Sequence, residues 1–207
     1  MPIASPAPVL GATPALPLII GLAGPAGCGK STTAALLANM PGWERIAFAD
    51  PLRALLLALH PAWDSWHLGP GKDLTPADGG LSARAMMRAA GDWAKGYQPD
   101  FFVAIAQQRL WGLLLRQVHV AVEDVRYEPE AAMIRACGGV IVHVSRTEVV
   151  FRRDHDSELG IEPAREDLHL RNWGGIRDLR AELNQLLPDC VARRGIAPEH
   201  PPGRVGG

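Results

Sequence analysis

One short motif constrains this chain more than any other part of its sequence. Residues 24–31 read G-P-A-G-C-G-K-S and match the pattern G-x-x-x-x-G-K-[ST] at every fixed position. The motif lies between an apolar run (16–22) and a helix-forming stretch (32–40), which is the strand–loop–helix context of a P-loop. Its glycines permit a tight turn whose N–H groups, with the helix N-terminus, can surround phosphate oxygens. The sequence therefore predicts a nucleoside triphosphate site.

Each position of the predicted loop has an expected task. The Lys30 ammonium would reach the β- and γ-phosphates of ATP, and the Ser31 hydroxyl would hold Mg²⁺. The positions expected to contact the nucleotide are Gly24, Ala26, Gly27, Cys28, Gly29, Lys30, Ser31 and Thr32. Cys28 lies where a helix N-terminus could lower the pKa of its thiol, but we interpret it as a loop position and not as a nucleophile.

Composition limits the class of protein. The 207 residues are 47% hydrophobic and 21% charged, with a formal net charge of -1, as expected for one globular α/β domain. Such a balance gives no overall field that would favour DNA or an anionic membrane, and no apolar run is long enough to span a bilayer. The three cysteines lack metal-ligand spacing, which indicates reduced thiols and a cytoplasmic protein.

Strand and helix patterns alternate along the chain, which predicts a three-layer αβα sandwich around a central parallel sheet. The expected strands are Leu18–Leu22, Trp43–Phe48, Gln117–Val122, Val140–Val144 and Leu168–Arg171. The expected helices are Ser31–Asn39, Leu52–His60 with Asp50 as N-cap, Ser82–Gly96, Asp100–Leu115, Pro129–Cys137 and Gly175–Leu187. We expect a loop or lid-like insertion at 61–80, a disordered leader at 1–15 and a flexible tail at 191–207.

Acidic and basic residues follow the later strands. Glu123 and Asp124 come at the expected carboxyl end of a strand, the edge at which parallel sheets bind ligands, and we favour Asp124 as the Mg²⁺-supporting carboxylate. Arg126 follows, and would face either the transferred phosphate or a structural carboxylate. The charged segment 146–167 has three arginines within its first eight residues, Arg146, Arg152 and Arg153, which is typical of a lid that closes over phosphates. No N-K-x-D motif occurs, which weakens a GTPase interpretation.

Six segments resemble, in order, segments of phage deoxynucleoside monophosphate kinases. They are F-A-D-P-L-R (48–53), S-A-R…G-D-W…D-F-F-V (82–103), E-D-V-R-Y-E-P-E (123–130), G-G-V-I-V-H-V-S-R (138–146), D-H-D-S-E (154–158) and L-R-N-W-G-G (170–175). The resemblance covers residues 16–187. It implies an adenylate-kinase-like P-loop kinase domain over 16–190, with a helical monophosphate-binding insertion at about 50–115 and a lid at about 146–167.

The resemblance also implies roles for individual residues. Asp50 would orient or deprotonate the acceptor phosphate or touch its sugar, beside Arg53, and Arg84 would clamp the monophosphate. The remaining implied positions are Asp124 for Mg²⁺, Arg126 and Arg146 for charge neutralisation, and Glu158 near the lid hinge or nucleotide. Arg88, Asp92 and Lys95 replace the family's Gln, Thr and Arg, which predicts a changed base-recognition pocket. Trp93 is the aromatic residue that we expect to stack on the base.

Three hypotheses follow. The first is a kinase that transfers phosphate from ATP·Mg²⁺ to a (deoxy)nucleoside monophosphate, with a homodimer as a further expectation. The second is a related kinase that acts on another small acceptor or on a modified base in DNA, which the altered residues at 88 and 92 motivate. The third is a nucleotide-binding regulatory protein without catalysis, against which the intact Lys30, Ser31 and Asp124 argue.

Overall fold

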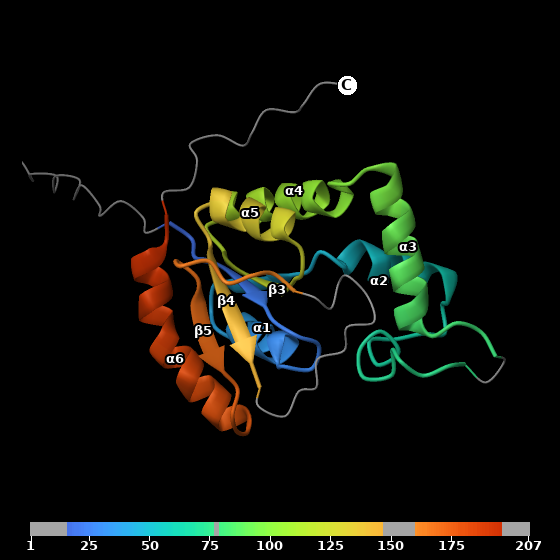
Figure 1. Cartoon of the computed structure of the whole chain (residues 1–207), viewed down its shortest axis with the longest axis horizontal. Coiled ribbons are helices and arrows are strands. Elements are labelled where there is room, and N and C mark those ends of the chain that lie inside the picture. Colours follow the sequence, from blue (N-terminus) through green and yellow to red (C-terminus); the bar gives the residue numbers. More distant parts are fainter. Residues whose placement is uncertain (1–15, 77–78, 147–159, 196–207) are drawn as a thin grey trace, which may run out of the picture.

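The computed structural model describes residues 16–76, 79–146 and 160–195. Its elements follow the chain in an alternating order (Figure 1). They are β1 (Ile19–Ala23), α1 (Lys30–Ala38), β2 (Trp43–Ile46), α2 (Asp50–Leu59), α3 (Ala83–Tyr97), α4 (Phe101–Leu115), β3 (His119–Val125), α5 (Glu128–Ala136), β4 (Val140–Ser145), β5 (Leu168–Arg171) and α6 (Ile176–Arg193).

The five strands form one parallel sheet in the order β2-β3-β1-β4-β5. Strand β1 is central, with Ile20 opposite Ala121 of β3 on one side and Val140 of β4 on the other. All five carboxyl ends meet at one edge, and β1 continues there into the predicted P-loop. The αβα sandwich with a central parallel sheet is therefore confirmed.

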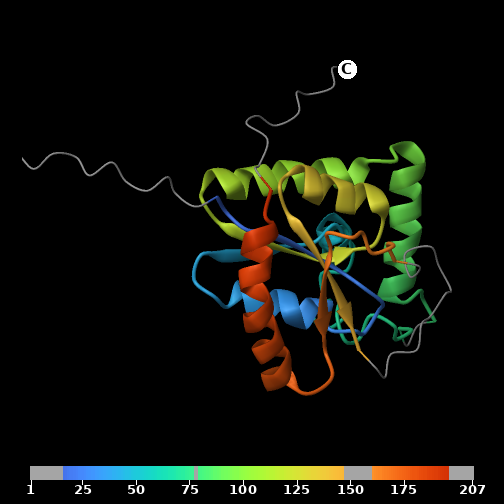
Figure 2. The ribbon, with the colours of Figure 1, turned by 60° about the vertical axis from the view of Figure 1, so that its left-hand side comes forward.

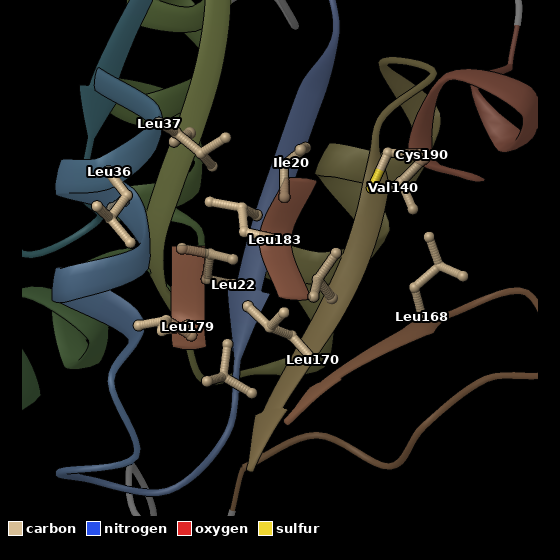
Figure 3. Close-up of a cluster of buried hydrophobic side chains, with 14 of the residues drawn as sticks. Ile20, Leu22, Leu36, Leu37, Val140, Leu168, Leu170, Leu179, Leu183 and Cys190 are labelled. Atoms are coloured by element: carbon tan, nitrogen blue, oxygen red, sulfur yellow. The ribbon is translucent and has the colours of Figure 1, made fainter. Parts of the chain in front are cut away.

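Alternate residues of the buried strands face opposite layers, as the pleat of a strand requires. Ile20 and Leu22 of β1 pack with α1 and α6 in one hydrophobic cluster, whose side chains Figure 3 shows. Ile19 and Ala23 face the other cluster, which contains residues of α4 and α5. Both faces of β1 are covered, which is why its sequence is a continuous apolar run.

Helices α2 and α3 lie beyond the end of the sheet, away from both layers (Figures 1 and 2). A third, smaller cluster joins them: Leu56 of α2, Leu68 of the intervening segment and Ala83 of α3 are all buried together. The segment 61–76 therefore packs through Leu68 and is not a simple surface connection. No helix in the described parts of the chain is long and apolar enough to cross a membrane.

Two element boundaries differ from the sequence prediction in ways that matter for the site. Strand β3 continues to Val125, so Glu123 and Asp124 lie inside its last residues and are buried. Asp50 is the first residue of α2 and not its N-cap, because Ala49 occupies that position.

Helix α6 extends to Arg193, past the expected end at Leu187 and three residues into the segment predicted as a tail. The helix continues through Pro188 because tertiary contacts hold its last turns. Cys190 is buried in the cluster beneath α6, and Arg193 Nη1 donates to the Glu166 carbonyl oxygen at 2.9 Å.

Asp167 connects the described end of the predicted lid, residues 160–167, to α5 and β4. The Asp167 carboxylate accepts hydrogen bonds from His143 Nε2 (2.9 Å), Arg135 Nη2 (2.9 Å) and the amide of Ala164 (2.9 Å). Burial raises the pKa of Asp167, but these donors outweigh it and lower the pKa overall. Residues 147–159, which include Arg152, Arg153 and Glu158, lie outside the described residues.

Candidate active site

The P-loop between β1 and α1 depends on three glycines with positive φ. The φ angles of Gly24, Gly27 and Gly29 are 130°, 79° and 111°. A Cβ at Gly24 would lie 2.3 Å from the carbonyl oxygen of Val144, so the loop passes directly against β4. The backbone conformation and the close approach both exclude a side chain at Gly24.

Lys30 begins α1 and folds back over this loop. Its Nζ donates to the carbonyl oxygens of Gly24 (2.6 Å) and Pro25 (2.7 Å), and these contacts hold the ammonium at the centre of the turn. Ala26 and Gly27 lie at the rim, and Ser31 and Thr32 are exposed on the first turn of α1. These side chains face solvent at the helix N-terminus, where an anion is stabilised.

Cys28 differs from its neighbours in the loop because its side chain is fully buried in the cluster beneath α1. Burial raises the pKa of the thiol, and the opposing effect of the Lys30 charge is smaller. The suggested lowering by the helix N-terminus is therefore wrong, because desolvation outweighs it.

A residue near the other end of the chain forms a hydrogen bond to the backbone of the P-loop. Asn172, which follows β5 and is 5% exposed, donates from Nδ2 to the carbonyl oxygen of Cys28 at 2.9 Å. The backbone amide of Asn172 donates to the carbonyl oxygen of Ser145 at the end of β4. Asn172 belongs to one of the six resembling segments, but no role was predicted for it; its position next to a glycine-rich turn was the signal available.

Asp124 connects β3 to the turn that begins α2. Its two carboxylate oxygens accept the amide hydrogens of Phe48 (2.7 Å) and Ala49 (3.0 Å). The preceding residue, Glu123, instead pairs with Arg53 at 2.9 Å and Arg45 at 3.5 Å. The two adjacent acids thus have different partners, and Asp124 is the one that lines the adjoining pocket.

That pocket has a volume of about 280 Å³ and lies between α2, α3, the start of α4 and the β3–α5 connection. Its walls are largely apolar. They are formed by Phe48, Ala49, Leu52, Leu68, Met87, Gly91, Pro99, Phe102, Val103 and Pro129. The polar lining residues are Arg53, Lys72, Arg84, Arg88, Asp92, Lys95, Asp124, Arg126, Tyr127 and Glu130. An apolar cavity with a few convergent polar groups is the usual form of a small-molecule site.

Five of the residues predicted to bind substrate line this pocket together. They are Arg53, Arg84, Arg88, Asp124 and Arg126. Arg84 forms a hydrogen-bonded ion pair with Asp73. Burial alone would lower the pKa of Arg53, but Glu123, Asp124 and Asp50 raise it, so this side chain stays a cation inside the pocket wall.

Asp50 and Trp93 are not among the residues that line the pocket. The Asp50 carboxylate is directed to Arg53, to Arg109 and to the amide of Ala47. The Trp93 side chain is 76% exposed, on the side of α3 turned away from the pocket. Neither residue therefore lies in the pocket wall, and Asp50 instead pairs with Arg53, which does line the pocket. A direct substrate contact of Asp50 or Trp93 stays a prediction from the sequence.

Three polar lining residues had no predicted role. Lys72 comes from the segment before α3, Tyr127 accepts a hydrogen bond from Lys95 Nζ at 2.9 Å, and Glu130 caps α5. Glu130 Oε2 accepts the amides of Arg126 (2.7 Å) and Tyr127 (3.1 Å). Burial raises the pKa of Glu130 to about 7. Its position three residues after Tyr127, as in a capping box, was a usable signal.

A second hollow lies on the other side of the P-loop, at the ends of β4 and β5. It is lined by Ser145, Arg171, Asn172, Trp173 and Glu182, and Trp173 Nε1 donates to Glu182 Oε1 at 3.1 Å. Because β1 lies between β3 and β4, the P-loop separates this hollow from the pocket. Arg146, the last residue described before the lid segment, is exposed next to Ser145.

The chain is similar to several kinases, although no family model matches it. A protein of Acanthamoeba polyphaga mimivirus, described as "Putative deoxynucleotide monophosphate kinase", is 28% identical over 181 residues, which cover 80% of this chain and 94% of the relative. Among solved structures, an APS kinase of Mycobacterium tuberculosis is 18% identical with a TM-score of 0.46, covering 84% of this chain and 99% of that one. A dephospho-CoA kinase of Campylobacter jejuni is 16% identical with a TM-score of 0.45, covering 84% and 97%.

Proposed function

We propose that this protein transfers the γ-phosphoryl group of ATP to a (deoxy)nucleoside monophosphate. The observation that carries the proposal is the position of two sites on adjacent strands. The P-loop leaves β1 at the same sheet edge at which Asp124 and Arg126 of the β3 end line the cationic pocket. Neighbouring parallel strands are about 5 Å apart, so a donor on one site and an acceptor in the other can meet.

The pocket suits a nucleoside monophosphate as the acceptor. Its apolar walls fit a base and sugar, and its arginines fit a phosphate, because planar guanidinium groups bind phosphate oxygens bidentately. A phosphate oxygen is already a nucleophile at neutral pH, so the reaction needs no strong base. Positioning of the two substrates and neutralisation of charge supply most of the rate.

The donor triphosphate would occupy the P-loop, with its base toward the hollow on the β4–β5 side. Lys30, now on the Gly24 and Pro25 carbonyl oxygens, would turn to the β- and γ-phosphates. We assign Ser31 and Asp124 to Mg²⁺: the hydroxyl directly and the carboxylate through water, because both Asp124 oxygens already accept backbone amides. A bound Mg²⁺ would bridge phosphate oxygens and offset their charge.

Arg126 and Arg146 are the arginines that we assign to the transferring phosphate. They flank the P-loop on opposite sides, since Arg126 follows β3 and Arg146 follows β4. A cation on each side would stabilise the charge that spreads over the phosphoryl oxygens in the transition state. Glu158, expected near the lid hinge, keeps that role as a proposal from the sequence.

The viral relative supports a deoxynucleoside monophosphate as the acceptor, since its description includes that activity. The test is ADP formation from ATP·Mg²⁺ against a panel of deoxy- and ribonucleoside monophosphates, with modified bases included and Lys30→Met as the inactive control. Turnover that requires one or a few acceptors and disappears in the variant is the expected result. Transfer to duplex DNA alone would favour the modified-base kinase, and tight ATP binding without transfer to any acceptor would favour a regulatory protein.

A further inference from the structure

Lys72 reaches the pocket from a segment whose backbone is hydrogen-bonded to α3 and to the preceding turn. Its carbonyl oxygen accepts the backbone amide of Arg84 at 2.9 Å, which joins it to the first turn of α3. Just before it, Gly71 donates to the Trp66 carbonyl oxygen at 2.8 Å and lies under the Trp66 ring, where a Cβ would be 2.4 Å from a ring carbon. Backbone hydrogen bonds therefore tie the chain on both sides of Lys72 to its neighbours.

The cations that line the pocket differ in their partners. Arg53 pairs with Glu123 and Asp50, and Arg84 pairs with Asp73, so neighbouring carboxylates balance both guanidinium groups. The Lys72 ammonium and the Arg126 guanidinium have no ion-pair or hydrogen-bond partner in the part of the chain that the structure describes. Among the described residues, no carboxylate forms an ion pair with either of these two positive charges.

The surroundings of Lys72 are unfavourable for its own charge. Burial lowers its pKa, and the nearby charges of Arg84, Arg126 and Arg53 lower it further, against the smaller raising effect of Asp73. The other acids that line the pocket are Asp92, Asp124 and Glu130. An ammonium in such a position is stabilised when an anion enters beside it, because the anion supplies the missing opposite charge.

We infer that Lys72 and Arg126 form the subsite that binds the phosphate of the acceptor, and that Arg53 and Arg84 shape the wall around it. In this assignment Arg126 lies between the two substrates and contacts both the acceptor phosphate and the phosphoryl group in transfer. The inference rests on the proposed function and adds Lys72 as a substrate-binding residue. A guanidinium fork and a single ammonium can together hold a phosphate dianion from two directions. A nucleoside without a phosphate would leave both cations unpaired, so the subsite selects for monophosphates.

The first experiment measures anion binding at the subsite without catalysis. The chain contains three lysines, Lys30, Lys72 and Lys95, so an amine-reactive label at limiting concentration can be followed at each of them by peptide mass spectrometry. Inorganic phosphate is the probe. We expect phosphate to slow labelling of Lys72 in a saturable way and to leave Lys95, which is engaged with Tyr127 and Asp92, unchanged. Labelling of Lys72 that saturating phosphate does not alter would overturn the inference.

The second experiment separates binding from chemistry. Lys72→Met should raise the KM for the monophosphate about 10- to 100-fold, the range for loss of a charged hydrogen bond, and leave the KM for ATP unchanged. Lys72→Arg should recover most of the loss. Arg116→Met is the matched control, because it removes one positive charge at the exposed C-terminal end of α4. A Lys72→Met protein with a lower melting temperature and an unchanged acceptor KM would show a structural role only.

The two proposals fail differently. If no monophosphate is phosphorylated but phosphate still protects Lys72, the anion subsite stands and the proposed function is wrong. If transfer occurs and neither the labelling nor the acceptor KM responds at Lys72, the kinase stands and the assignment of Lys72 is wrong.

Discussion

Asn172 donates a 2.9 Å hydrogen bond from its side-chain amide to the carbonyl oxygen of Cys28, which lies 144 residues earlier in the chain. The bond is buried and crosses from the end of β5 to the P-loop. The same Nδ2 atom lies 2.5 Å from the place where a Cβ on Gly29 would project. The conformation of the P-loop is therefore held by a residue that the motif itself does not contain.

Asn172→Ala should weaken ATP binding. The substitution leaves the buried Cys28 carbonyl oxygen without its donor, which costs about 1–3 kcal/mol. We expect the Kd for ATP, measured by calorimetry, to rise about 10-fold and the melting temperature to fall. Asn184→Ala, at an exposed position of α6, is the control and should change neither. Equal ATP affinity in the Asn172→Ala and unmodified proteins would contradict this role.

Gly29→Ala should be more damaging than Gly27→Ala. Both glycines have positive φ, at 111° and 79°, so alanine is strained at either position. A Cβ at position 29 would also collide with Asn172, whereas at position 27 no atom lies within 4 Å. The Kd for ATP of the Gly27→Ala variant reports the backbone strain alone, and that of the Gly29→Ala variant reports the strain together with the collision. Similar losses in both would show that the contact with Asn172 does not matter.

Asp124→Asn should distort the start of α2 and weaken acceptor binding. Both carboxylate oxygens accept amide hydrogens, from Phe48 and Ala49, and an asparagine would present its NH₂ group to one of these donors. We expect a loss of about 1–3 kcal/mol in the free energy of unfolding and a higher acceptor KM. Glu128→Gln, at an exposed acid of α5, is the matched control. Unchanged denaturant midpoints for Asp124→Asn would rule out this role.

Glu130 should make the protein less stable as the pH rises from about 4.5 to 7. Burial raises the pKa of this carboxyl from 4.5 to about 7, so the folded state binds the proton more tightly than the unfolded chain does. The stabilisation is complete below pH 4.5 and is lost as the pH rises through about 7. The difference corresponds to about 3 kcal/mol.

Glu130→Gln removes this titration while its amide oxygen can still accept the Arg126 and Tyr127 amides. Relative to the unmodified protein, the variant should gain stability between about pH 5 and pH 8 in urea unfolding curves. Glu166→Gln, at an exposed acid, serves as the reference. A stability difference between the unmodified protein and the Glu130→Gln variant that stays constant with pH would contradict the raised pKa.

Much of the architecture follows from local patterns. The P-loop motif predicted the β1–α1 turn, and apolar runs and helical periodicity predicted five strands and six helices close to their observed bounds. Boundaries were wrong where tertiary contacts extend an element: α6 passes Pro188 because Cys190 and Arg193 are anchored. Such contacts involve distant residues and leave no local signal.

The residues that line the pocket could also be predicted only in part. On α3 the lining residues fall at 84, 87, 88, 91, 92 and 95, which is one face of a helix. Trp93 lies off that face and is exposed, a direction that its aromatic character did not indicate. Choosing the face required knowledge of how α3 packs against α2.

By itself, the sequence determined that a strand turns through a phosphate-binding loop into a helix within an alternating α/β order, because dihedral freedom and periodicity are properties of neighbouring residues. Only the tertiary structure decided which side chains meet at the site. It placed Lys72 beside Arg126, turned Asp50 toward Arg109 and brought Asn172 onto the P-loop. These contacts depend on strand order and helix direction, which bring together residues that are far apart along the chain.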